Sequence, residues 1–389
     1  MAFRQKPVEE QVIVITGASS GIGLATAHAF RARRARGLVL VARNEEALRS
    51  IAEELSGGRT YAIAVAADVS RHEDLERVAN MAIDTFGGFD TWVNDAAVAL
   101  YGSVAEIPMK DQRQLFDINY WGVVDGSMIA ADHLRHNGGT IVNVGSVLSE
   151  RAMILQTQYS ASKHAVKAFT DGLRMELESQ GAPVSVTLIK PSSIDTPYVE
   201  HARNYLDRET AVPPPAYDPH LVAKAIVFAA EHRRREITIG FGGWVIGAMG
   251  KVAPRLVDKA MEWTGHGSQT TDHPERPAMR DNLYQAREDG DIYSSLPGEP
   301  RKTSLLLEAQ LHPFLSAAIL AGIAAGVAAL FVTPWMGGAR RPRREVRRRP
   351  ISRYQHTIRR SGNGHDKHTF GPGHVSQRVA SEGRSQPRH

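Results

Sequence analysis

The stretch Gln11-Val-Ile-Val-Ile-Thr16-Gly17-Ala-Ser-Ser-Gly21-Ile-Gly23 decides the fold. Its first half predicts a short buried strand, the glycines predict a tight turn, and a helix is predicted to follow. Glycines let a backbone approach a pyrophosphate, and a helix N-terminus offers free N–H groups and partial positive charge. A tight turn without a ligand is the alternative. The strand before it and the helix after it favour a nucleotide-binding turn.

The rest of the first 240 residues alternates apolar strands with helices. Strands are predicted at Gln11–Thr16, Leu38–Ala42, Tyr61–Ala66, Thr91–Val93, Thr140–Val144, Val184–Ile189 and Glu236–Ile239. One long helix is predicted from Pro108 to His136, and another from near Tyr159 to Ser179. Strands that are apolar throughout indicate a parallel sheet covered on both faces. We therefore predict an α/β fold, with a doubly wound, Rossmann-like parallel sheet of about seven strands.

Charge and composition divide the chain. From residue 339 to 389 there are 14 Lys and Arg against 3 Asp and Glu, so the first 338 residues carry a net charge near −6. The chain has no cysteine, which excludes disulfides and thiolate metal sites and fits a reducing compartment. No metal site is predicted. The polar start, Met1–Gln11, lacks the apolar core of a signal peptide.

The segment Tyr159-Ser-Ala-Ser-Lys163 places a phenol and an ammonium four residues apart, on one face of a helix. A neighbouring cation favours the phenolate, so Lys163 is expected to lower a tyrosine pKa that is ordinarily about 10. Ser146 follows the fifth predicted strand, 13 residues earlier, and Asn119 lies upstream in Asp117-Ile-Asn-Tyr-Trp-Gly122. Each alone has a structural explanation, as a turn serine or a buried amide. Together they indicate a catalytic group at the carboxyl ends of the strands.

These motifs resemble the short-chain dehydrogenases/reductases over roughly residues 10–245. The glycine spacing Gly-x-x-x-Gly-x-Gly is that of the family, and Asn119, Ser146, Tyr159 and Lys163 match its catalytic tetrad. The resemblance implies hydride transfer between nicotinamide and a carbonyl or alcohol carbon. Tyr159 would transfer the proton, and Ser146 would hydrogen-bond the developing oxyanion. Lys163 would hold the nicotinamide ribose, and Asn119 would complete a proton relay through water.

The same resemblance implies which residues bind the cofactor. They are Gly17, Ser19, Ser20, Gly21, Ile22, Gly23, Arg43, Asp68, Val69, Asn94, Tyr159, Lys163 and Thr196. Where NAD enzymes of the family carry an acid, this chain has Ala42 followed by Arg43. A cation at the start of a helix is unfavourable, and a 2′-phosphate would relieve that cost, so NADP(H) is favoured over NAD(H). Asp68 matches the acid of the adenine pocket, although it could equally cap the next helix.

One departure from the family lies in Asn94-Asp95-Ala-Ala97, where the family prefers Asn-Asn-Ala-Gly. It favours the alternative of a catalytically weak dinucleotide-binding scaffold or regulatory protein. An epimerase or dehydratase of the same superfamily is a third hypothesis, which the glycine spacing disfavours. The substrate loops contain Met153, Ile154, Leu155, Tyr198 and Tyr205, which predict an apolar, lipophilic small-molecule substrate. The resemblance also allows a homo-oligomer.

Four segments are predicted: a catalytic domain at 1–245, an extension and linker at 246–304, a hydrophobic helix at 305–338 and a basic disordered tail at 339–389. Pro313–Val332 is 20 residues without charge, long enough to cross a bilayer, although an Ala/Gly-rich buried or dimerisation helix is the alternative. The arginine block beside it suits anionic membrane lipid, whereas nucleic acid is not favoured because no aromatic residues interleave it. We expect membrane association with a cytoplasmic catalytic domain.

Overall fold

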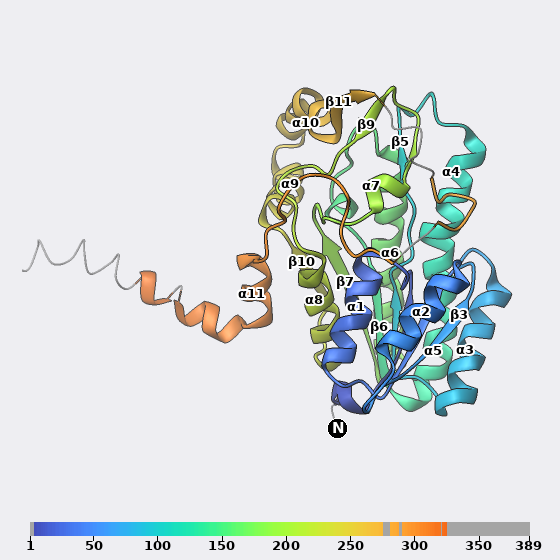
Figure 1. Cartoon of the computed structure of the whole chain (residues 1–389). Helices are drawn as coiled ribbons and strands as arrows, with labels where there is room; N and C mark the ends of the chain where they lie inside the picture. The colour runs from blue at the N-terminus through green and yellow to red at the C-terminus, as the bar shows by residue number, and fades with distance from the viewer. Residues whose placement is uncertain (1–3, 275–280, 288–289, 320, 325–389) are drawn as a thin grey trace, which may run out of the picture. The chain divides into compact units, whose positions relative to one another are not determined.

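The computed structural model describes residues 4–274, 281–287, 290–319 and 321–324. Its centre is a seven-stranded parallel sheet in the order β10-β7-β6-β4-β1-β2-β3 (Figure 1). The strands are β1 (Val12–Thr16), β2 (Gly37–Ala42), β3 (Tyr61–Ala66), β4 (Thr91–Asn94), β6 (Gly139–Val144), β7 (Val184–Pro191) and β10 (Glu236–Ile239). All seven predicted strands are confirmed to within two residues at each end.

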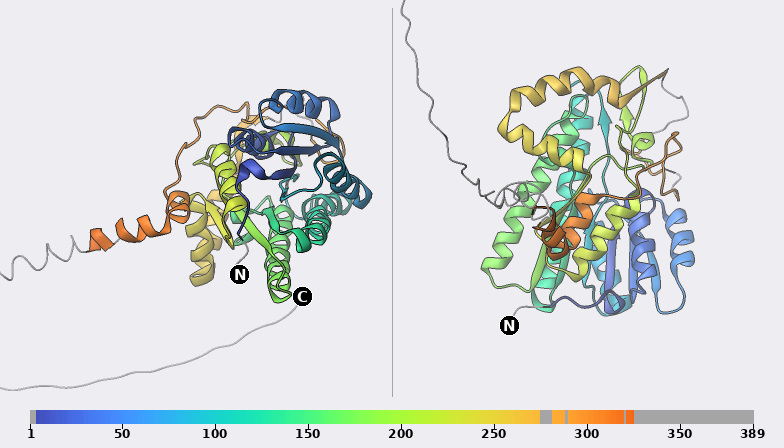
Figure 2. Two further views of the ribbon diagram at one scale, coloured as in Figure 1. Left: turned by 90° about the horizontal axis from the view of Figure 1, so that it is seen from below. Right: turned by 90° about the vertical axis from the view of Figure 1, so that its left-hand side faces the viewer.

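Alternate side chains of a strand are buried in two separate cores, because successive side chains point to opposite faces of the sheet. Ile13 and Ile15 face one layer, and Val12 and Val14 face the other. The first layer contains α1 (Gly21–Ala32), α2 (Glu45–Leu55) and α8 (Pro219–Glu231); the second contains α3 (His72–Phe86), α5 (Gly122–Asn137) and α6 (Thr157–Ser179). Figure 2 shows the sheet between these layers. The predicted doubly wound architecture is confirmed.

The strand order reverses at β1, which pairs with β2 on one side and with β4 on the other. Chain connections leave β1 and β4 toward opposite faces of the sheet, so a crevice opens above their carboxyl ends. Open α/β sheets bind ligands at this position. The glycine turn after β1 and the polar residues after β4 and β6 therefore meet at one edge.

The long helix predicted from Pro108 to His136 is interrupted. It consists of α4 (Met109–Phe116), a π-helical turn (Asp117–Trp121) and α5. A π turn inserts an extra residue and changes the direction of the side chains around it. Asn119 lies within this turn, which packs against α6.

The chain beyond β10 forms α9 (Phe241–Val252), α10 (Pro254–Gln269) and β11 (Thr270–Pro274). β11 pairs with β9 (Arg208–Thr210) in a small separate sheet, and the short β5 (Leu100–Tyr101) pairs with β8 (Arg203–Asn204). These elements and α7 (Tyr198–His201) cover the carboxyl edge of the main sheet (Figure 1).

Part of the segment predicted as a linker packs against the folded body. Residues 281–287 and 290–304, which we call the C-terminal strap, cross the carboxyl edge in orange in Figure 1. Leu283 of the strap is completely buried. The strap ends at α11 (Leu305–Leu311), whose Leu307 and Leu311 are buried in the first core layer. The segment predicted to begin a membrane helix thus begins as part of the folded body.

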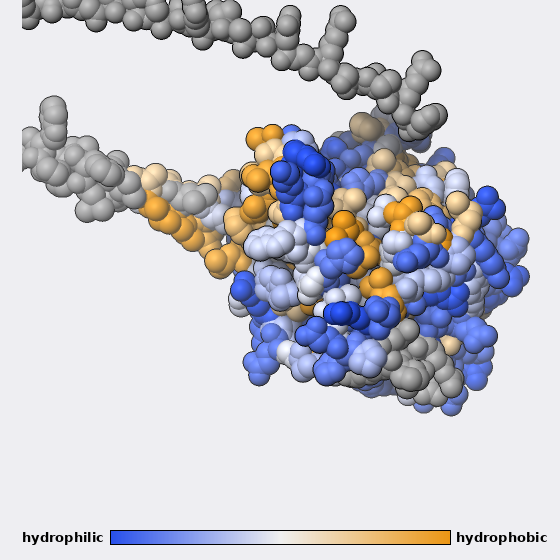
Figure 3. All heavy atoms as spheres, turned by 90° about the horizontal axis from the view of Figure 1, so that it is seen from above, coloured by the Kyte–Doolittle hydropathy of each residue, from blue (hydrophilic) through white to orange (hydrophobic). Residues whose placement is uncertain are grey.

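Within the described residues, no single helix is long and apolar enough to cross a membrane. Leu305–Leu311 and Pro313–Ala324 pass such a test only as a pair, with a bend of 114° between them. Figure 3 shows hydrophobic residues along this C-terminal segment. The rest of the predicted hydrophobic helix, residues 325–338, and the basic tail lie outside the described residues.

Candidate active site

One cavity of about 770 Å³ runs along the carboxyl edge of the sheet. Its lining begins at the glycine turn with Gly17, Ser19, Ser20, Gly21 and Ile22 and passes Ser146, Tyr159 and Lys163. It ends at the apolar inner sides of α9 and α10, with Val245, Ile246, Met249, Leu256, Val257 and Met261. A cradle for phosphates, a catalytic group and an apolar chamber are therefore continuous.

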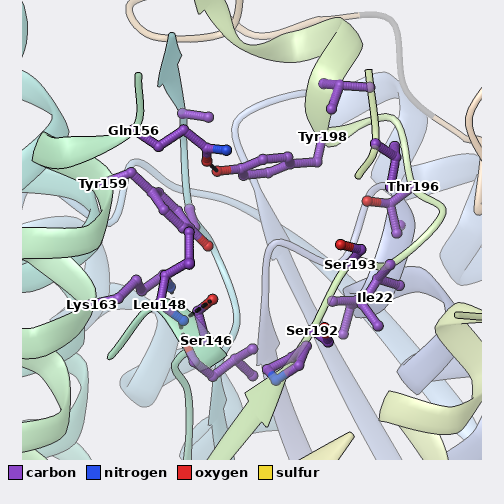
Figure 4. Close-up of a pocket in the computed structure, with 18 of the residues that line it drawn as sticks. Ile22, Ser146, Leu148, Gln156, Tyr159, Lys163, Ser192, Ser193, Thr196 and Tyr198 are labelled. Atoms are coloured by element: carbon purple, nitrogen blue, oxygen red, sulfur yellow. Dashed lines mark hydrogen bonds between the residues drawn. The ribbon is translucent and has the colours of Figure 1, made fainter. Parts of the chain in front are cut away.

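Tyr159 and Lys163 extend from α6 into the cavity, and Ser146 reaches the same point from the end of β6 (Figure 4). Ser146 begins the 3-10 turn Val147–Ser149, and its Oγ accepts a hydrogen bond from the Leu148 amide at 3.0 Å. Lys163 is 2% exposed, and its Nζ donates to the Val144 carbonyl at 2.8 Å. Ser146 lies close enough to Tyr159 to lower the pKa of the Tyr159 hydroxyl. The structure brings these three predicted catalytic residues together.

Burial dominates the acid–base properties of this group. It raises the pKa of Tyr159 to about 12, although hydrogen bonds from Tyr198 and Ser146 oppose the rise. It also lowers the pKa of Lys163 to about 8, against the opposing effect of Asp95. The Lys163 ammonium lies 5.7 Å from the centre of the Tyr159 ring, with its Nζ bonded to Val144. The prediction that Lys163 lowers the tyrosine pKa is therefore wrong for this geometry, in which burial raises it.

Asn119 is fully buried and lies beside the cavity, not in its lining. Its Oδ1 accepts from the Val98 amide at 2.8 Å, and its Nδ2 donates to the Val98 carbonyl at 2.9 Å and the Ser162 hydroxyl at 3.3 Å. Its side chain therefore fixes the loop after β4 against α6. A role in a proton relay stays a prediction.

Asp95 lines the cavity close to the catalytic group. Burial raises the pKa of its carboxyl to about 7, while Lys163 and a hydrogen bond from the Gly23 amide oppose that rise. The N-terminus of α1 favours negative charge at this position. The acid that departs from the family pattern is therefore in electrostatic contact with both Lys163 and Tyr159. The departure of Asp95 from the family pattern is evident in the sequence, whereas its coupling to Lys163 and Tyr159 is evident only in the structure.

The glycine turn is held in shape by close backbone contacts. Gly17 has a φ of +72°, and a Cβ there would lie 2.9 Å from Ala96 Cα. A Cβ on Gly23 would lie 2.1 Å from the Gly17 carbonyl oxygen. Thr16 Oγ1 accepts from the amides of Asp95 at 3.1 Å and Ala96 at 3.2 Å. Only glycine fits at 17 and 23, and the resulting cradle fits the phosphates of a dinucleotide.

At the opposite end of the cradle, Ala42, Arg43, Asp68 and Val69 line the cavity, as predicted for the adenosine half of a cofactor. Asp68 also accepts from the Ser70 amide at 3.0 Å and the Ser70 hydroxyl at 2.7 Å, so it shapes the turn before α3. Thr196 lines the cavity beside Gly21.

Two residues predicted to bind the cofactor do not line the cavity. Gly23 allows the close backbone packing of the glycine turn. Asn94 lies at the end of β4, outside the lining of the cavity. The Asn94 side chain accepts from Trp92 Nε1 at 2.8 Å and donates to Ser127 at 3.0 Å and Asn143 at 2.8 Å. This buried network fixes the end of β4.

The apolar chamber differs from the sequence prediction. Met153 and Tyr198 line it, whereas Ile154, Leu155 and Tyr205 do not. The centre of the Tyr198 ring lies 5.5 Å from that of the Tyr159 ring, and the Tyr198 hydroxyl donates to Gln156 Oε1 at 3.3 Å (Figure 4). The sequence pattern predicts Tyr198 only as a loop aromatic, because a contact between α6 and α7, about forty residues later, has no local signal.

Comparison with known proteins agrees with this geometry. The model of the short chain dehydrogenase family matches residues 11–206. An uncharacterized oxidoreductase, YxnA of Bacillus subtilis, is 44% identical over 330 residues, which cover 84% of this chain and 92% of that protein. That alignment is longer than the family match and therefore includes much of the C-terminal extension. An 11-beta-hydroxysteroid dehydrogenase A of Sesamum indicum is 37% identical over 49% of this chain and 54% of its own length.

Two solved structures resemble the fold. A short chain dehydrogenase of Burkholderia cenocepacia in complex with NADP has a TM-score of 0.56 and 26% identity, covering 66% of this chain and 99% of that one. A short chain dehydrogenase/reductase of Burkholderia phymatum in complex with NAD has a TM-score of 0.55 and 26% identity, covering 70% and 100%. The chain belongs to the short-chain dehydrogenase family. It is an oxidoreductase of the CH–OH/C=O class.

Proposed function

We propose that this protein transfers a hydride between NADP(H) and the carbonyl or alcohol carbon of an apolar small molecule. One observation carries the proposal: Ser146, Tyr159 and Lys163 converge in a cavity that is continuous with the glycine turn. The bound nicotinamide would supply or accept the hydride. The apolar residues of α9 and α10 lining the same cavity favour a lipophilic substrate.

The roles of the protein groups follow from their positions. The Tyr159 hydroxyl gives a proton to the substrate oxygen in reduction and takes it back in oxidation. The Ser146 hydroxyl, already within hydrogen-bonding reach of Tyr159, donates to the same oxygen as negative charge develops on it. Lys163 places a buried cation beside the phenol and is itself fixed by the Val144 carbonyl.

The preference for NADP(H) is supported by Arg43. It stands directly after β2 and before α2, where Ala42 provides no carboxylate to hold a ribose 2′-hydroxyl. Within the described residues, the buried Arg43 Nη1 has no hydrogen-bond partner. A guanidinium in this position suits a phosphate, which accepts two parallel hydrogen bonds.

An NADPH-consumption screen of the purified full chain against aldehydes, ketones and quinones tests this function. We expect turnover with apolar carbonyl compounds and a higher kcat/KM for NADPH than for NADH. Absence of turnover with retained cofactor binding would instead support the scaffold alternative.

We further propose that the protein is attached to a membrane with its catalytic body in the cytoplasm. Large apolar side chains are exposed on α9 and α10, among them Val252, Leu256 and Trp263, and on the C-terminal helical segment, including Phe314 and Ile323. The basic block at 340–350 suits anionic head groups.

Truncation tests this attachment. Ending the chain after His312 retains Leu307 and Leu311 in the core, so we expect a folded, active enzyme that leaves the membrane fraction. Full-length protein that remains in the supernatant after vesicle sedimentation would contradict attachment. Protease treatment of sealed inverted vesicles, which should cleave residues of the body, tests the cytoplasmic orientation.

A further inference from the structure

The C-terminal strap is bonded directly to the glycine turn of the cofactor site. The Gly290 amide donates to the Ser19 carbonyl at 2.9 Å, and the Gly21 amide donates to the Asp291 carbonyl at 2.9 Å. The residues of each pair are at least 270 positions apart in the chain. The strap therefore lies directly against the glycine turn.

The strap also reaches the adenosine end of the site. Arg43 Nη2 donates to the Asn282 carbonyl, and Asn44 Nδ2 donates to the Arg287 carbonyl at 2.7 Å. Asn282, Ala286 and Arg287 line the same cavity as Arg43. Arg287 thus brings a second arginine to the end of the cavity that lacks an acid after β2.

The position of Arg287 is fixed by the packing of the preceding residues. Leu283 is buried in the second core layer. The Tyr284 hydroxyl donates to Asp111 at 2.6 Å, and Arg203 bridges Asp111 at 2.9 Å and Asp281 at 3.0 Å. Three residues of the strap are therefore held by the body within six positions of Arg287.

We propose that Arg287 is a specificity-determining residue that binds the adenosine 2′-phosphate of NADP(H) together with Arg43. A phosphomonoester near neutral pH carries almost two negative charges and several acceptor oxygens, and arginine pairs with it through two parallel N–H groups. Arg43 alone would balance only part of that charge. This inference rests on the proposed NADP(H) preference and assigns part of it to the C-terminal extension.

The test measures Kd for NADPH and NADH by nicotinamide fluorescence, with 2′,5′-ADP and 5′-AMP as competitors, on the full chain. For Arg287→Ala we expect NADPH affinity to fall about tenfold or more, with NADH affinity within about twofold of wild type. Arg287→Lys should restore part of the loss. The matched control is Arg301→Ala, which removes the same side chain from an exposed position of the same strap.

The outcomes separate this inference from the proposed function. Equal wild-type affinities for NADPH and NADH would refute the NADP(H) preference and this inference with it. A wild-type preference that Arg43→Ala removes and Arg287→Ala leaves intact would overturn the role of Arg287 alone. Equal weakening of both cofactors by Arg287→Ala and Arg287→Lys would show that the strap acts only as a structural cover, which also overturns it.

Discussion

The catalytic wall of the cavity and its roof are built in different ways. The wall, formed by β6 and α6, places its groups on regular elements with buried side chains, such as Lys163 at 2% exposure. The roof, formed by α9, α10 and the strap, leaves Val252 83% and Trp263 88% exposed. It is fastened to the wall by charged groups. Glu150 accepts from Lys167 at 2.8 Å and Lys190 at 3.1 Å and pairs with Lys251 of α9 at 2.9 Å.

This contrast assigns different tasks to the two regions. Hydride transfer needs the proton donor fixed within a fraction of an ångström, and close packing supplies that precision. Enclosing a cofactor and a substrate needs a surface that can open. Helix α9, which an ion pair between Lys251 and Glu150 holds and which leaves Val252 exposed, costs less to open than a packed core. We therefore expect changes in the wall to affect kcat and changes in the roof to affect binding and stability.

The largest effect is expected in the wall. Tyr159→Phe removes the hydroxyl that transfers the proton and keeps the ring against Tyr198. We expect kcat to fall by about 10²–10⁴-fold, while NADPH affinity stays within a few fold. Steady-state rates and fluorescence titration measure the two quantities. A variant that keeps more than a tenth of the wild-type kcat would remove Tyr159 from its acid–base role.

The next prediction tests whether the roof is anchored in the core. Leu307 of α11 is completely buried, and α11 follows the strap directly. Leu307→Ala should lower the free energy of unfolding by about 2–5 kcal/mol, since it leaves a cavity in the first core layer. Urea denaturation measures the loss. Leu305→Ala, at an 86% exposed position of the same helix, is the control and should change it by less than about 0.5 kcal/mol.

These two regions also differ in what the sequence could predict. The strands, the glycine turn and the positions of Ser146, Tyr159 and Lys163 follow local rules, namely apolar runs, helical spacing and turn chemistry, and the structure agrees. The strap has a Gly-, Pro- and charge-rich composition typical of a linker. Its order comes from contacts such as Gly290 with Ser19 and Tyr284 with Asp111, which join residues more than 170 positions apart and have no local pattern.

The electrostatic coupling among Tyr159, Lys163 and Asp95 also could not be predicted from the sequence. The Tyr-x-x-x-Lys spacing predicts a lowered tyrosine pKa, but burial raises it because the surrounding wall excludes water. The sequence cannot give the degree of burial of one side chain. Asp95 was visible as an unusual residue, yet its effect on Lys163 depends on a fold that brings the end of β4 beside α6.

A third prediction compares two sides of the adenosine site, namely Arg43 at the end of β2 and the C-terminal strap. Arg43→Asp replaces a cation by an acid at the end of β2, where the carboxylate can bind a ribose 2′-hydroxyl and repels a 2′-phosphate. We expect the ratio of NADPH to NADH affinity to fall by about 10–100-fold and the preference to reverse. Titration with both cofactors measures the ratio. An unchanged ratio would mean that discrimination between NADPH and NADH depends entirely on the strap.

The smallest effect is expected from Asp95→Asn. This substitution hardly changes the shape of the side chain but removes one negative charge from the catalytic site. The asparagine oxygen can still accept from the Gly23 amide. The Asp95 carboxylate raises the pKa of both Lys163 and Tyr159, so its removal should lower both. In alcohol oxidation the rate rises as the proton acceptor becomes deprotonated. We therefore expect the limb of the kcat/KM profile that rises with pH to move to lower pH, by roughly one unit.

The pH range of the difference identifies its cause. Because the pKa of Asp95 is about 7, its carboxyl is mostly charged above that pH and mostly neutral below it. The two profiles should therefore separate above pH 7 and converge toward pH 6, where both proteins carry a neutral group at position 95. A constant ratio of rates across the whole range would indicate a change in packing, and would rule out electrostatic control of Tyr159 and Lys163 by Asp95.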